Sequence, residues 1–187
     1  LPEQMTTPIP VQNALQSGEE DLEITILDIV IFVWLAGCLI FAAVHLISYF
    51  HYKRQVTTAG RLIEDIDLFR QVSELKRELH ISRSIRVIEY REAGSPMIMG
   101  FLKPVLVLPE EQYSPVELYF ILKHELVHFK RGDVYLKLLF VTANAVHWFN
   151  PLIWILQREA VVDMELSCDE RVTRGAGLAE RKAYTEA

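Results

Sequence analysis

Two histidines and a glutamate occur together in the stretch His124-Glu125-Leu126-Val127-His128, which has the pattern His-Glu-x-x-His. In a helix, residues four apart lie on the same face, so both imidazoles point to one place. Two imidazoles at this spacing can bind one zinc ion, with each nitrogen about 2.0–2.1 Å from the metal. Glu125 is offset by about 100° around the helix and can reach a zinc-bound water. The stretch predicts a zinc hydrolase with Glu125 as general base.

The surrounding sequence carries the signals of a helix. Ser114 suits the N-cap, Pro115 suits the first helical position, and Glu117 completes a capping box. Gly132 can adopt the left-handed conformation that ends a helix. An apolar stripe follows at helical spacing, formed by Leu118, Ile121, Leu122 and Leu126.

A long apolar stretch follows, from Val134 to Gln157. Two full membrane crossings need about 40 residues, more than this stretch provides. A single crossing would put a third zinc ligand on the wrong side of the membrane. We therefore expect a helical hairpin that turns near Phe149-Asn150-Pro151, because proline readily follows a break. The hairpin is either buried against the domain or dipped into the inner leaflet.

The returning helix, from Leu152 to about Arg174, carries two acidic residues one turn apart. Glu165 lies about as far beyond the turn as His128 lies before it, so we expect Glu165 to be the third zinc ligand. A set of two histidines and one glutamate leaves the fourth position open for water, which is typical of a catalytic site. Asp169 then suits a supporting role, in which it accepts the free ring N–H of a ligand histidine.

Three nearby residues compete for roles in the site. Cys168 lies on a similar face, and a thiolate binds zinc well, but a lone cysteine in a helix is usually a small buried residue. His147 is a candidate proton donor to the leaving amine, although a histidine on an apolar helix more often packs or caps. Asp133 is expected to cap the helix that follows it.

An uncharged run from Ile29 to Phe50 has the length of a membrane span. Acidic residues precede it and Lys53 follows it, so the positive-inside pattern predicts that the rest of the chain is cytoplasmic. The alternative is a buried helix of a soluble protein. We expect an extracytoplasmic linker over residues 1–23, a transmembrane helix over 24–54 and a metallopeptidase domain over 55–187. The chain starts with leucine and ends within a helical pattern, so we expect it to be an excerpt of a longer protein.

The segment between the span and the zinc helix contains strand patterns. Arg61 to Leu79 is amphipathic and predicts one helix or two short ones, and we expect strands at Ser84–Tyr90, Met97–Phe101 and Val105–Leu108. The prolines around the last strand favour sheet edges over the centre. An exposed edge beside the zinc helix can hold a peptide by strand addition, but a purely structural sheet is equally open. The predicted fold class is α+β and mainly helical.

The composition narrows the function classes. Hydrophobic residues make up 51% of the 187 residues, which favours a membrane protein. The net charge of −6 excludes a broad nucleic-acid-binding surface, so we expect no direct contact with nucleic acid. Cys38 and Cys168 lie in unrelated segments, so no disulfide framework is expected, in keeping with a reducing compartment.

The motifs together resemble the membrane-bound zinc metallopeptidases of the BlaR/MecR antirepressor type. The resemblance rests on the runs His-Glu-Leu-Val-His-Phe-Lys-Arg-Gly-Asp, His-Trp-Phe-Asn-Pro-Leu-Ile-Trp and Glu-Leu-Ser-Cys-Asp-Glu, and on Ser-Pro-Met-Ile-Met-Gly-Phe-Leu-Lys-Pro-Val-Leu-Val-Leu-Pro upstream. It covers about Asp67 to Thr173, and the preceding span fits the third transmembrane helix of the family. The resemblance implies a gluzincin-like domain with Zn²⁺ on His124, His128 and Glu165.

The resemblance also implies a function, which is proteolysis of a cytoplasmic regulator such as a transcriptional repressor, or self-cleavage, in response to an extracellular signal. Two alternatives stay open. One is a housekeeping membrane protease of the HtpX or CAAX-processing kind, which usually has a longer hairpin that spans the membrane. The other is a non-catalytic receptor segment that relays a conformational change. A homo-oligomer is compatible with each of these functions.

Overall fold

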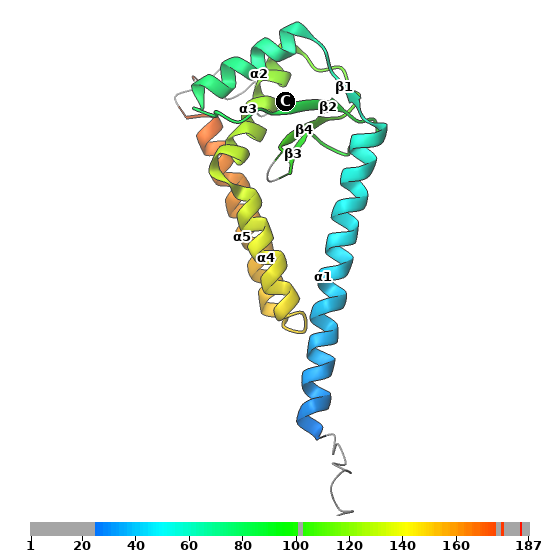
Figure 1. Ribbon diagram of the computed structural model, residues 1–187. Coiled ribbons are helices and arrows are strands. Elements are labelled where there is room, and N and C mark those ends of the chain that lie inside the picture. Colours follow the sequence, from blue (N-terminus) through cyan, green and yellow to red (C-terminus); the bar gives the residue numbers. More distant parts are fainter. Residues whose placement is uncertain (1–24, 101–102, 175–176, 178–183, 185–187) are drawn as a thin grey trace, which may run out of the picture. The chain divides into compact units, whose positions relative to one another are not determined.

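The computed structural model describes residues 25–100, 103–174, 177 and 184. The chain divides into two compact units, Leu1–Leu35 and Ala36–Ala187. Figure 1 shows the elements in chain order. They are α1 (Ile26–Ala59), β1 (Arg61–Leu62), α2 (Ile66–Glu78), β2 (Arg86–Glu89), β3 (Met97–Met99), β4 (Val105–Leu108), α3 (Pro115–Arg131), α4 (Asp133–Val146) and α5 (Pro151–Val172). The mainly helical α+β class is therefore confirmed.

Helix α1 contains the uncharged run and extends nine residues beyond Phe50 to Ala59. Among the described residues it is the one helix that is long and apolar enough to cross a membrane. Val56, near its C-terminal end, is fully buried and packs in a cluster with Ile88 and Val107 of the sheet. The end of α1 is therefore anchored in the α/β part of the larger unit.

The sheet has four strands in the order β1-β2-β4-β3. Strands β2 and β4 run parallel, whereas β1 and β3 are antiparallel to their neighbours. Our expectation that β4 forms an edge was wrong, because β4 lies between β2 and β3 and all four of its residues are buried. Pro104 and Pro109 lie just outside its ends, where no ladder hydrogen bond is lost.

Two other expectations about this region need correction. Arg61 and Leu62 form strand β1 and are not helical, because helix α2 begins only after Asp65, whose side chain accepts the backbone N–H groups of Asp67 and Leu68. The strand expected over Met97–Phe101 ends at Met99, and Phe101 lies outside the described residues.

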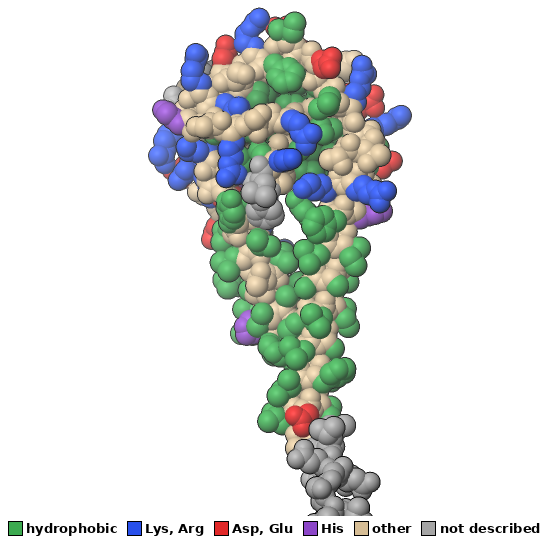
Figure 2. Space-filling view, viewed as in Figure 1, with side chains coloured by type: hydrophobic (Ala, Val, Ile, Leu, Met, Phe, Trp, Pro, Cys, Tyr) green, Lys and Arg blue, Asp and Glu red, His purple; other side chains and the backbone are tan. Residues whose placement is uncertain are grey.

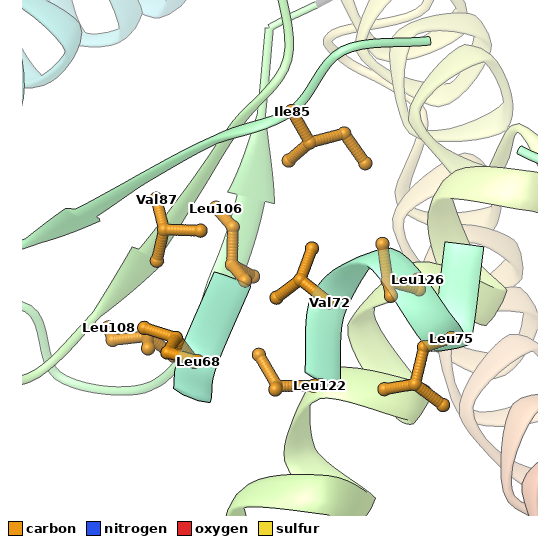
Figure 3. Close-up of a cluster of buried hydrophobic side chains, with 9 residues drawn as sticks. All are labelled: Leu68, Val72, Leu75, Ile85, Val87, Leu106, Leu108, Leu122 and Leu126. Atoms are coloured by element: carbon orange, nitrogen blue, oxygen red, sulfur yellow. The ribbon is translucent and has the colours of Figure 1, made fainter. Parts of the chain in front are cut away.

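One hydrophobic cluster joins α2, α3 and one face of the sheet. Figure 3 shows Leu122 and Leu126 of α3 among side chains from α2 and the strands. Both leucines have no exposed surface. The complete cluster consists of Leu68, Val72, Leu75, Ile85, Val87, Leu106, Leu108, Leu122 and Leu126. Because these two leucines face the core, the other side of α3 is left for the histidines.

The ends of α3 are built as the sequence predicts. The hydroxyl of Ser114 accepts the backbone N–H of Glu117, and the Glu117 carboxylate accepts the N–H of Ser114, which completes the capping box. Gly132 closes the helix at φ 76°, where a residue with a Cβ is disfavoured. Helix α4 starts at the next residue, so this glycine makes a sharp corner between the two helices.

Helices α4 and α5 lie side by side and form the predicted hairpin (Figure 1). The turn covers residues 147–150, and the side chain of Asn150 caps α5 by accepting the backbone N–H of Leu152. Near the open end, α5 packs on α3 through Phe120, Val127 and Cys168. The hairpin therefore returns α5 to the helix that carries the two histidines.

Candidate metal centre

Three side-chain atoms from two helices meet at one point. The Nε2 atoms of His124 and His128 lie 2.9 Å apart. Oε2 of Glu165 lies 3.4 Å from Nε2 of His124 and 3.1 Å from Nε2 of His128. The hairpin thus brings Glu165 beside the two histidines. This position was expected from the sequence, because Glu165 lies about as far beyond the turn as His128 lies before it.

These separations fit a zinc ion. Ligand atoms bonded at about 2.0–2.1 Å in a tetrahedron lie about 3.3 Å from one another. The two separations to Glu165, 3.1 and 3.4 Å, lie close to this value, and the 2.9 Å between the two imidazole nitrogens is about 0.4 Å shorter. Two neutral imidazole nitrogens and one carboxylate oxygen are also the donor set of many catalytic zinc sites. The residues present therefore fit zinc, with one coordination position left for water.

The second ring nitrogen of each histidine faces an acidic side chain. Nδ1 of His128 lies 2.6 Å from Oδ2 of Asp133, and Nδ1 of His124 lies 3.2 Å from Oδ1 of Asp169. A carboxylate at this position accepts the ring N–H and leaves Nε2 free to bind a metal. Asp169 therefore lies where the sequence placed it. The expectation for Asp133 was wrong, because α4 has no side-chain cap and Asp133 contacts His128 instead.

Tyr184 adds a further contact to His124. Its hydroxyl lies 2.8 Å from Nδ1 of His124 and donates a hydrogen bond to Asp169. Burial and the neighbouring Asp169 raise the pKa of Tyr184, so the phenol keeps its proton. Burial, and then the neighbouring His128, lower the pKa of His124, which favours the neutral ring that a metal requires.

Arg131 joins the end of α3 to both following helices. Its guanidinium donates to the backbone carbonyl of Met164 in α5, at 3.1 Å, and pairs with Asp133, at 3.3 Å. Asp133 is almost completely buried, and a buried carboxylate needs such a partner. Arg131 thereby holds Asp133 against His128.

Glu125 lies beside the ligand cluster and contacts the edge of the sheet. Its Oε2 accepts the backbone N–H of Ile98 in β3 at 3.0 Å. Burial raises the pKa of Glu125 to about 7, although His128, the Ile98 N–H and Lys137 oppose the rise. A carboxyl group with a pKa near neutrality is well matched to accept and release a proton.

Cys168 is the other candidate ligand close to the histidines. Its sulfur and the ring nitrogens of His124 and His128 lie within 4.8 Å of one another. The side chain is completely buried, and its thiol donates to the backbone carbonyl of His124 at 3.5 Å. Burial raises the pKa of Cys168 to about 12, which disfavours the thiolate that binds metal. The chemistry therefore favours Glu165 over Cys168.

A cavity of about 830 Å³ opens at the cluster. Its walls include the residues of the candidate metal site, the segment from Ser95 to Ile98 that leads into and begins β3, Lys137 of α4 and Tyr184. Ile98 pairs with Leu106 across the antiparallel ladder, yet its N–H points to Glu125. In such a pair the carbonyl also points away from the neighbouring strand. The free edge of β3 therefore presents backbone groups to this cavity.

The structure does not bring His147 to this cavity. It forms the C-cap of α4, at the turn of the hairpin, whereas the metal-site residue Asp133 starts the same helix. The fourteen residues of α4 separate the two ends by about 20 Å. His147 is thus too far away to serve as the proton donor, whereas Ser95, Lys137 and Tyr184 carry donors and line the cavity.

Sequence reasoning missed three residues of the site. Asp133 follows a helix-ending glycine and has the sequence context of a cap, so nothing local pointed to His128. Arg131 is a basic residue in the last turn of α3, where its favourable interaction with the helix dipole already accounts for it. Tyr184 lies fifteen residues beyond Asp169 and outside the motifs, so no spacing rule identified it.

The model of the family described as BlaR1 peptidase M56 matches residues 4–187. The regulatory protein BlaR1 of Bacillus licheniformis is 30% identical over 116 residues, which are 61% of this chain and 19% of that protein. The methicillin resistance mecR1 protein of Staphylococcus aureus is 31% identical over 114 residues, 59% of this chain and 18% of that protein. The chain thus spans about a fifth of the length of these relatives.

Proposed function

This chain belongs to the BlaR1 peptidase M56 family, and we propose that it is a membrane-anchored zinc endopeptidase of a signalling system. Its substrate is a cytoplasmic regulator, such as a transcriptional repressor, or the protein itself. The observation that carries the proposal is the convergence of one side-chain atom each from His124, His128 and Glu165, with separations of 2.9 to 3.4 Å that one zinc ion can bridge. The domain is gluzincin-like, because two ligands lie one turn apart on one helix and the third lies on a later one.

When bound, zinc would acidify a coordinated water and polarise the scissile carbonyl. Glu125 takes a proton from the attacking water and passes it to the leaving nitrogen. The hydrogen bond from Ile98 holds the carboxylate at the edge of the cavity. Lys137 lines the same cavity and supplies a positive charge to the oxygen that gains charge during attack. Asp133 and Asp169 keep the two imidazoles in the required tautomer.

The free edge of β3 is the proposed binding site for the substrate backbone. An extended peptide that adds to this edge can donate a main-chain hydrogen bond to the outward carbonyl of Ile98, whose N–H already donates to Glu125, and its scissile bond then lies against α3. The contacts between α3 and β3 bring the strand close to the histidines and to Glu125. This arrangement suits a protein substrate with an extended segment better than a compact small molecule.

The anchor and its orientation complete the proposal. Helix α1 crosses the membrane, and the positive-inside rule places the segment after Lys53 in the cytoplasm. The names of the relatives describe regulatory and resistance proteins. A regulator in the cytoplasm is therefore the substrate that this orientation favours.

The proposal is tested by comparing wild-type protein with Glu125→Gln in cells and in purified form. New protein N-termini are collected from cells that carry each form, and zinc per chain is measured on the purified proteins. We expect Glu125→Gln to keep one zinc per chain and to lower cleavage of a soluble regulator, or of itself, by about 10²–10⁴-fold. Glu159→Gln, at an exposed position of α5, is the matched control and should behave as wild type.

Each alternative gives a different result in this experiment. Loss of cleavage at many membrane proteins would favour a housekeeping protease. Signalling that survives Glu125→Gln with no change in N-termini would favour a relay without chemistry. A wild-type protein without zinc would overturn the proposal itself.

A further inference from the structure

The hairpin of α4 and α5 turns hydrophobic side chains outward instead of into a core. No Asp, Glu, Lys or Arg occurs from Leu138 to Gln157. Figure 2 shows hydrophobic side chains over this hairpin on the face drawn, while Lys and Arg side chains gather over the α/β part. Within this uncharged stretch, six hydrophobic side chains are between 47% and 68% exposed, namely Leu138, Leu139, Phe149, Leu152, Ile155 and Leu156. An apolar surface of this extent needs a non-aqueous partner.

Two contacts within the larger unit fix the level of the hairpin turn along α1. A Cβ on Gly37 would overlap the indole of Trp148, so the glycine leaves room for that ring. The ring of Phe41 meets the ring of Trp154 edge to face, with centroids 5.6 Å apart. Gly37 and Phe41 lie near the middle of the uncharged run of α1. The turn of the hairpin is therefore level with the middle of the membrane span.

The length of the apolar part of the hairpin is consistent with a turn at the middle of the membrane. From Leu138 to Val146, helix α4 rises about 14 Å, which is close to half of a hydrocarbon layer of about 30 Å. The charged residues next to the apolar part, Lys137 on α4 and Arg158 on α5, then reach the headgroup level. Lys53 lies about 18 Å from Phe41 along α1 and reaches a similar level. Basic residues at three separate places thus mark one membrane surface.

Several polar groups at and near the hairpin turn are satisfied internally, which suits a hydrocarbon environment, although the buried side-chain oxygen of Asn144 has no hydrogen-bond partner among the described residues. The backbone N–H groups at the turn donate to backbone carbonyls, His147 to Ala143 and Asn150 to His147. The indole N–H of Trp154 donates to the carbonyl of Trp148, at 3.3 Å. Between the helices, the amide of buried Asn144 donates to the side chain of Gln157, a type of bond that holds helices together in lipid.

We propose that the α4–α5 hairpin is inserted into the membrane leaflet on the side of the metal centre, with its turn packed against α1 at mid-bilayer. Asp133 and Lys137 lie at the base of the hairpin, so the cavity of the metal centre opens at headgroup level. The occupant of the apolar surface is lipid. The inference rests on α1 as a membrane span and on the hairpin contacts, and it does not depend on zinc or on proteolysis.

The chain contains three tryptophans, which provide a direct test. The full protein is reconstituted in phosphatidylcholine vesicles with spin-labelled lipids that quench either near the headgroup or near the acyl-chain end. The double variant Trp34→Phe with Trp148→Phe leaves Trp154, which is 44% exposed, as the sole fluorophore. We expect the deep label to quench Trp154 at least about twofold more strongly than the shallow label. These conservative changes keep an aromatic ring at each position.

A matched control places the fluorophore in the α/β part. In a background with all three tryptophans changed to phenylalanine, Val116→Trp puts an indole at an exposed position in the first turn of α3. We expect neither label to quench it. The proposal is overturned if Trp154 is quenched no more than this control, as when a second copy or another protein covers the hairpin. Stronger quenching by the shallow label would also overturn it, because the hairpin would then lie on the surface.

A second measurement tests the packing against α1 independently of fluorescence. Gly37→Leu fills the space that Trp148 occupies. In a background with Trp34→Phe and Trp154→Phe, which keeps Trp148 as the sole fluorophore, we expect this change to displace the turn and to reduce the deep-label quenching of Trp148, whereas Leu39→Phe, at an exposed position of α1, should leave it unchanged. Equal depth in both variants would overturn the packing of the turn on α1.

Discussion

The backbone N–H of Ile98 donates a hydrogen bond of 3.0 Å to Oε2 of Glu125, and this bond links the edge of the sheet to the zinc-motif helix. Ile98 is free to donate because its antiparallel pairing with Leu106 leaves its N–H on the outer edge of β3. The bond fixes the position of a carboxyl group whose burial disfavours its charge. The candidate general base is thus held by the same strand edge that is available to a peptide.

The ionisation of Glu125 predicts a pH-dependent stability of the metal-free protein. The pKa of this carboxyl is 4.5 when unperturbed, and burial raises it to about 7 in the folded state. Between these values the folded state binds more protons than the unfolded state, so stability falls as the pH rises from about 4.5 to about 7. The Glu125→Gln variant has no ionisable group at this position, so its stability does not fall for this reason as the pH rises.

The measurement is thermal unfolding of zinc-free protein in detergent. We expect the melting temperature of Glu125→Gln to exceed that of wild type by a margin that widens from about pH 5 to about pH 8. The other titratable groups are the same in both proteins, so the difference isolates Glu125. A margin that stays constant across this range would contradict the prediction.

The acidic partners of the histidines predict graded effects on zinc affinity. Asp133→Asn should weaken zinc binding by about 10–100-fold, because the ring of His128 loses its charged acceptor. Asp169→Asn should have a smaller effect, since its distance to His124 is 3.2 Å against 2.6 Å, and its side chain is more exposed. Competition with a chromophoric chelator measures both affinities.

The control for this pair is Asp163→Asn, at an exposed position on α5. Its zinc affinity should equal that of wild type. If Asp133→Asn binds zinc as tightly as this control, then the contact with His128 has no part in metal binding. An effect of Asp169→Asn larger than that of Asp133→Asn would reverse the order that the distances predict.

The two candidates for the third ligand give opposite predictions. Glu165→Ala should lose bound zinc, whereas Cys168→Ala should keep one zinc per chain, because the Cys168 thiol is buried and donates to a backbone carbonyl. Zinc per chain is measured on purified protein after dialysis, with Cys38→Ala as the cysteine control. A Cys168→Ala protein without zinc, beside a Glu165→Ala protein that retains it, would assign the ligand to the thiol.

Local signals in the sequence predicted local structure well. The caps of α3 depend on residues within four positions of each other, and both ends of the helix formed as expected. The position of the hairpin turn followed from length and from Asn150-Pro151. These features need no knowledge of distant parts of the chain.

Features that depend on tertiary neighbours were not predictable in this way. The central place of β4 depends on which strands pair, and flanking prolines carry no information about that pairing. Asp133 has the sequence context of a helix cap, but its carboxylate contacts His128 at 2.6 Å and makes no cap hydrogen bond. Tyr184 contacts His124 although it lies beyond the end of α5 and sixty residues away in the sequence, and no motif spacing predicts this contact.

The corner at Gly132 predicts a linked loss of stability and metal binding. Gly132 has φ 76°, and a side chain in this conformation costs about 1–2 kcal/mol. Gly132→Ala should therefore lower the free energy of unfolding by about 1–2 kcal/mol. It should also weaken zinc binding, because the corner sets the position of Asp133 relative to His128.

Gly94→Ala is the matched control, since a Cβ there meets no atom within 4 Å among the described residues. Denaturant unfolding and chelator competition on both variants check the two effects, and a Gly132→Ala protein that equals the Gly94→Ala protein in both would show that the corner is not strained.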